Sequence, residues 1–185
     1  MRLSRVPVAL LGLLLSLGAA PRQADALCSC RHARVPHCAD PAAKHKVTVD
    51  IDLAVVDGTV EVITQSGPFH VPVADLDGKP VLFLFLPRGE VFQGFFDDVV
   101  TIAVGTMQGA TASIPTPEAF SPGEYEMLLF VDAADNGPGT SVGPQRGDLA
   151  AFDNTVCDPT GVSIRVLVGC EDATVTLTNR HFIIF

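Results

Sequence analysis

Five side chains that are good ligands for soft metal ions lie within one short segment near the start of the chain. They are Cys28, Cys30, His32, His37 and Cys38. Thiolate and imidazole groups bind Zn²⁺ and Cu⁺ well. Their spacing matches neither a closed structural zinc pattern nor the C-x-x-C-H pattern of covalent haem attachment. Two interpretations therefore stay open: a disulfide-bonded arm with two exposed histidines, which we favour, or a Zn or Cu site.

Hard oxygen ligands gather in a second segment, residues 132–154, which is long and rich in Gly and carboxylates. The candidate ligands are Asp132, Asp135, Asn136, Asp148 and Asp153. Oxygen ligands of this kind suit Ca²⁺. The helix–loop–helix calcium pattern is excluded because Ala134 and Gly143 stand where it needs ligands. We expect a solvated acidic loop, with a calcium-bound loop as the alternative.

A hydrolase-like pattern falls in the same loop. Ser141 is the centre of a G-x-S-x-G string, and Asp148 and His181 follow it in the order of a catalytic triad. The nucleophile elbow needs a strand before the serine and a helix after it. Pro138 and Pro144 prevent both elements, so we predict no enzyme and keep hydrolase only as a remote alternative. Arg146-Gly147-Asp148 spells an adhesion tripeptide that is short enough to arise by chance.

The first 26 residues have the pattern of a secretory signal peptide. Arg2 and Arg5 precede an apolar run, and Ala24-Asp25-Ala26 is a small-residue cleavage site before Leu27. The run is shorter than the roughly 20 residues that a membrane-spanning helix needs. We therefore expect export to the periplasm, the cell surface or the extracellular space. Cleavage would lower the formal charge from −9 to −11.

Export would place the cysteines in an oxidising compartment, where disulfides persist. A local bridge between Cys157 and Cys170 is expected, since they flank a short strand-like run. Cys38 is expected to pair with Cys28 or Cys30, and one thiol is left over.

Alternation of apolar and polar residues predicts an all-β fold. The clearest case is 47–55, which is followed by Asp57-Gly58 and a second alternating run at 59–64, a strong hairpin signal. Residues 80–87 form an apolar run between two prolines and predict a buried central strand. Further strands are expected at 69–73 (an edge strand), 98–104, 124–132, 162–168, 173–178 and 181–185. Such short strands predict a single antiparallel β-sandwich domain over 46–185, Ig-like or transthyretin-like, or else a small barrel, after an N-terminal arm at 27–45.

A string of motifs within 122–152 strengthens the sandwich prediction. Pro122-Gly123-Glu124-Tyr125 leads into an apolar strand, and an acidic loop with Asn136-Gly137 and Gly147-Asp148 follows. This string resembles secreted bacterial β-sandwich modules of the transthyretin-like or carboxypeptidase-regulatory type. The resemblance implies a sandwich fold and life outside the cytoplasm, and it implies no catalytic activity.

The chain ends in an apolar run that predicts a β-strand. The charge of the whole chain limits the kinds of partner that it could bind. If the strand were left unpaired, it would favour self-association or a protein partner; its residues are Phe182, Ile183, Ile184 and Phe185. The absence of clustered Lys and Arg argues against nucleic acid. The sequence therefore predicts an exported, non-enzymatic sandwich with a structural or interaction role. The alternative is a Zn- or Cu-binding module that uses the Cys28–Cys38 arm.

Overall fold

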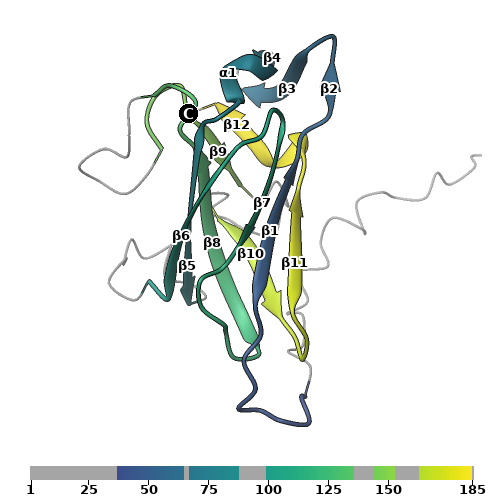
Figure 1. The fold of residues 1–185 in the computed structure, drawn as a ribbon, viewed down its shortest axis with the longest axis vertical. Coiled ribbons are helices and arrows are strands. Elements are labelled where there is room, and N and C mark those ends of the chain that lie inside the picture. Colours follow the sequence, from purple (N-terminus) through teal and green to yellow (C-terminus); the bar gives the residue numbers. More distant parts are fainter. Residues whose placement is uncertain (1–36, 65–66, 88–98, 136–143, 153–162, 185) are drawn as a thin grey trace, which may run out of the picture.

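The computed structural model describes residues 37–64, 67–87, 99–135, 144–152 and 163–184. The fold is all-β, as the alternation predicts, and its strands form two sheets that face each other (Figure 1). A three-stranded sheet has the order β11-β1-β7. A nine-stranded sheet has the path β2-β3-β12-β9-β8-β5-β6, with β10 paired to β8 and β4 paired to β3. No helix in the described ranges is long and apolar enough to cross a membrane.

The elements have the following bounds. They are β1 (Val47–Asp52), β2 (Val55–Val56), β3 (Thr59–Thr64), β4 (Gly67–Pro72), α1 (Val73–Leu76), β5 (Pro80–Pro87), β6 (Thr101–Thr106), β7 (Thr111–Pro115), β8 (Gly123–Val131), β9 (Leu149–Ala151), β10 (Ile164–Val168), β11 (Ala173–Leu177), the 3₁₀ turn η2 (Asn179–His181) and β12 (Phe182–Ile184).

The alternating run at 47–55 is divided between the two sheets. Its first part, β1, buries Val47, Val49 and Ile51 and pairs with β7 and β11. Two residues later the chain enters the other sheet as β2, which forms the expected hairpin with β3. Asp57 and Gly58 have φ values of 50° and 75°, the positive angles that a tight two-residue hairpin turn requires.

Strand β5 is the central buried strand that the run between two prolines predicts. It lies between β6 and β8, and alternate side chains enter opposite faces. Phe83 and Phe85 join the core between the sheets, which also contains residues of β1, β7 and β11. Leu84 and Leu86 pack with Phe130 in a smaller cluster on the other face.

Two strands within the described ranges escaped prediction. Strand β7 contains the small residues Ala112 and Ser113, so its alternation of apolar and polar residues is weak. The prolines that follow also argue against a strand when the sequence is taken alone. Strand β9 is only three residues long and lies in what we expected to be one continuous loop at 132–154. It pairs with β8 on one side and β12 on the other. Burial of Leu149 and Ala151, supplied by distant strands, stabilises it more than any local signal.

The expected disulfide pairings are wrong. Cys38 bonds Cys170, with Cα atoms 5.3 Å apart. Because a sulfur forms one disulfide, Cys170 does not pair with Cys157, and Cys38 does not pair with Cys28 or Cys30. The cause is the parallel pairing of β1 with β11, which sets Val47 opposite Ala173 and brings the segments before both strands together.

Candidate binding site

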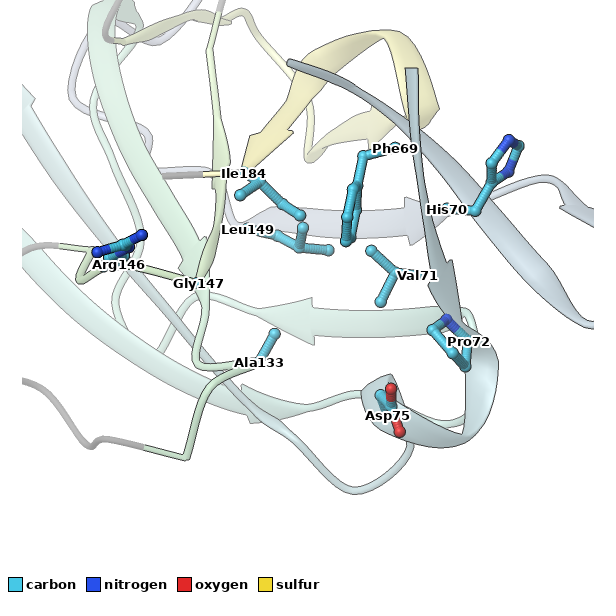
Figure 2. Close-up of a pocket in the computed structure, with 10 residues that line it drawn as sticks. All are labelled: Phe69, His70, Val71, Pro72, Asp75, Ala133, Arg146, Gly147, Leu149 and Ile184. Atoms are coloured by element: carbon cyan, nitrogen blue, oxygen red, sulfur yellow. The ribbon is translucent and has the colours of Figure 1, made fainter. Parts of the chain in front are cut away.

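A hollow of about 380 Å³ lies at the end of the molecule where β4, β9, β12 and α1 meet. Figure 2 shows Phe69, Val71, Leu149 and Ile184 gathered around it, with Ala133 and Pro72 beside them. Asp75, Gly147, His70 and Arg146 complete the lining. The side chains that meet in its centre are therefore apolar, and the charged residues lie at its margin.

Local register explains which side chains of β4 face the hollow. Among the described strands, β4 pairs with β3 alone, as an edge strand that contains two prolines should, and it sets Phe69 opposite Val62 and Val71 opposite Val60. Because Val60 and Val62 are fully buried, Phe69 and Val71 share the core-facing side of the sheet. His70 takes the other side and points away (Figure 2).

Phe69 is the most exposed large apolar residue of the lining. Its side chain is 50% exposed, whereas Val71 and Leu149 are buried. Strand β12 completes the floor because Ile184 pairs with Leu149. The hollow thus joins an edge strand, the acidic loop and the last strand, three segments that are far apart in the sequence.

The carboxylate of Asp148 holds the loop next to the hollow. Asp148 is 1% exposed. Its Oδ2 accepts the backbone N–H of Gln145 at 2.7 Å, and its Oδ1 accepts that of Ala134 at 3.4 Å. The carboxylate is buried and accepts hydrogen bonds from backbone N–H groups. It therefore cannot act as the exposed acidic end of an Arg-Gly-Asp adhesion tripeptide.

The described calcium candidates have different surroundings. Asp148 satisfies backbone donors, and Asp135 forms an ion pair with Lys79 Nζ. Asp132 is buried at the end of β8. Asn136 and Asp153 lie outside the described residues. Within the described ranges no group of three or more His, Cys, Asp or Glu side chains is arranged to hold a metal ion.

The disulfide lowers the number of side chains that could bind a soft metal ion. Cys38 is bonded to Cys170, and a disulfide sulfur is not the thiolate that Zn²⁺ or Cu⁺ binds. His37 lies beside it, whereas Cys28, Cys30 and His32, like Cys157, lie outside the described residues. The complete five-ligand set is therefore not available while the Cys38–Cys170 bond is intact.

His181 has a structural role in the described structure. Its Nδ1 accepts the backbone N–H of Thr178 at 2.9 Å, which closes η2 just before β12. In a catalytic triad that nitrogen instead donates to the acid. Ser141, the third member of the pattern, lies outside the described residues.

The C-terminal strand is paired on both sides. Strand β12 pairs antiparallel with β9 and parallel with β3. Phe182 is fully buried, Ile183 lies opposite both Ala150 and Ile63, and Phe185 is outside the described residues. Neighbouring strands already occupy both edges of residues 182–184. The unpaired strand that self-association through this segment would need is therefore not available there.

The fold and the hollow together define an all-β sandwich with an apolar recess at one end. Comparisons with protein-family models, with curated proteins and with solved structures find no match. The resemblance to transthyretin-like modules thus stays a prediction that rests on the residues alone.

Proposed function

We propose that this protein is an exported, non-enzymatic β-sandwich module that binds a small molecule carrying an apolar ring. The ring would enter the hollow beside Phe69. The observation that carries this proposal is the half-exposed Phe69 ring at the mouth of a recess whose floor is formed by Val71, Leu149 and Ile184.

The size and lining of the hollow support binding. Small-molecule sites are mostly apolar clefts of about 300–1,000 Å³ with a few polar groups that orient the ligand. The hollow, at about 380 Å³, falls at the lower end of this range. A six-membered or fused ring fits such a volume, and burying it against Phe69 removes apolar surface of both partners from water.

The N-terminal segment and the disulfide support export. Residues 1–26 have the three regions of a secretory signal peptide. The Cys38–Cys170 bond is of the kind that persists in oxidising compartments. A disulfide between residues that are far apart in the sequence is consistent with a protein that completes its folding after export.

Titration with the fluorescent probe 1-anilinonaphthalene-8-sulfonate tests the binding proposal. The folded protein should bind the probe at one site, and Phe69→Ala should weaken binding about tenfold, since 1.4 kcal/mol corresponds to a factor of ten. Val56→Ala is the matched control, because Val56 is 68% exposed but does not line the hollow. Equal affinity in both variants would contradict the proposal, provided both retain the thermal transition of the parent.

Expression of the intact chain in a secreting bacterial host tests export separately. The expected product is found outside the cytoplasm and begins at Leu27 by intact mass. A cytoplasmic product that retains Met1–Ala26 would contradict export without bearing on the hollow.

A further inference from the structure

We propose that the outer edge of β6 pairs with the same edge of a second copy of this chain, so that one sheet continues across a symmetric dimer. This inference is independent of the binding hollow, which is built from β4, β9, β12 and α1.

The register of β6 against β5 shows which main-chain groups face outward. Met107 N–H donates to Lys79 C=O at 2.9 Å and continues the ladder that sets Gly105 opposite Val81 and Ala103 opposite Phe83. In an antiparallel ladder, hydrogen-bonded pairs alternate along the strand. The N–H and C=O groups of Ile102, Val104 and Thr106 therefore point away from β5. Among the described residues, no strand pairs with that side of β6.

Strand β6 itself lacks the charged residues and prolines that protect many edge strands. Its sequence, Thr-Ile-Ala-Val-Gly-Thr, has no charge and no proline. Natural edges are blocked by Lys, Pro, bulges or covering segments, and an edge without them is open to another strand. By contrast, β4, an edge of the same sheet, contains Pro68 and Pro72.

The outward side chains of β6 extend an apolar surface. Val104 is 68% exposed and Ile102 is 49% exposed. They lie opposite Leu82 and Leu84 of β5, which sit on the same face of the sheet. A strand that added to β6 would place its own outward side chains beside Ile102 and Val104 and cover this surface.

Symmetry and charge favour a second copy as the occupant. An antiparallel edge is complementary to itself about a two-fold axis, and two-fold dimers bury the same patch on both subunits. An axis at Val104 sets Val104 opposite Val104 of the second copy and Ile102 opposite Thr106. The chain carries a formal charge of −9, so most surfaces of two copies repel, but the β6 strand contributes no charge of either sign.

Sedimentation velocity of the purified protein over a roughly hundredfold concentration range tests this proposal. The parent protein should show a concentration-dependent species of twice the monomer mass. Val104→Lys should raise the dimer dissociation constant about tenfold or more, because it sets two ammonium groups side by side at the axis. Val56→Lys, at a position that is also 68% exposed, should leave the dimer unchanged.

A charge-swap pair makes the test specific for the two-fold axis. Val104→Lys and Val104→Glu should each be monomeric alone and should form a mixed dimer when combined, because position 104 faces itself. A monomeric parent at the highest concentration would overturn the proposal, even if a synthetic extended peptide bound to β6. A dimer that both charge variants retain would overturn it as well.

Discussion

The hydroxyl group of Tyr125 donates a hydrogen bond to the backbone carbonyl oxygen of Ser121, with the two oxygens 3.0 Å apart. The ring also packs against Phe120, with centroids 5.3 Å apart and an edge-to-face geometry. A tyrosine that bonds a few residues back along its own chain fixes the corner between sheets in many β-sandwiches. This contact fixes the Pro122-Gly123 turn, and with it the start of β8, which pairs with β5, β9 and β10.

Replacing Tyr125 by Phe should remove this corner contact without opening the core. We expect a loss of about 0.5–1.5 kcal/mol in the free energy of unfolding, the usual net value of one hydrogen bond. Urea unfolding followed by circular dichroism measures it. An unchanged midpoint would show that the ring packing alone fixes the turn.

The same tyrosine gives the protein an alkaline pH dependence. Burial raises the pKa of Tyr125 above its ordinary value of 10.0. Its contribution to stability is fully present below pH 10.0 and is lost as the pH rises from there through the raised pKa, since only the unfolded chain then ionises readily. Tyr125 is the sole tyrosine of the chain, so phenolate absorbance reports it alone. A titration midpoint at or below 10.0 would contradict this prediction.

Removal of the Cys38–Cys170 bond should destabilise the fold strongly. The bond joins residues 132 positions apart, and the chain-entropy account assigns up to about 5 kcal/mol to a loop of that length. Cys38→Ser with Cys170→Ser should therefore lower the thermal midpoint. Peptide mapping without reduction should recover Cys38 linked to Cys170; a Cys157–Cys170 peptide would refute the pairing.

The carboxylate of Asp148 should contribute more to stability than a typical acidic residue of this loop. Asp148→Asn keeps one acceptor oxygen but sets an NH₂ group against the other backbone N–H at a buried position, at an expected cost of about 1–3 kcal/mol. Asp75→Asn, at an exposed position on the rim of the same hollow, should change stability by less than about 0.5 kcal/mol. Equal effects in chemical unfolding would count against the assigned role of Asp148.

Calcium should not stabilise the protein through the acidic loop. Asp148 accepts backbone N–H groups with both of its oxygens, and Asp135 is paired with Lys79. Thermal melting with millimolar CaCl₂ should therefore match melting with a chelator. A clear rise of the midpoint with calcium concentration would contradict this prediction and support the calcium-bound loop, because a ligand that binds the folded state stabilises it by mass action.

Strand positions could be read from the sequence wherever burial follows a period of two. The runs that became β1 and β3 have this pattern over six residues, whereas β5 could be recognised as a continuous apolar run between two prolines. The pattern does not say which sheet a strand joins, so the passage of the chain from β1 to β2 within one alternating run could not be foreseen. Short strands such as β9 depend on neighbours distant in sequence and leave almost no local signal.

The candidate site could not be predicted from the sequence either, because it too depends on pairing between strands that are distant in the chain. Phe69, Leu149 and Ile184 belong to three separate segments, and their proximity follows from the pairing of β12 with β9 and β3. The disulfide depends on another long-range pairing, in which Lys46 N–H donates to Asp172 Oδ1 at 2.8 Å beside the start of β11. Residue type indicated that Cys38 and Cys170 would be oxidised, but only the fold selects them as partners.

Chemical-shift mapping by NMR shows where on the protein an apolar ring binds. In a titration with 1-anilinonaphthalene-8-sulfonate, binding in the hollow should cause saturable shifts at the backbone amides of Phe69, Val71, Leu149 and Ile184. The chemical shifts of the amides of β1 and β11, on the opposite sheet, should not change. Shifts confined to β6, or no saturable shifts at all, would contradict the assignment of the hollow as the binding site.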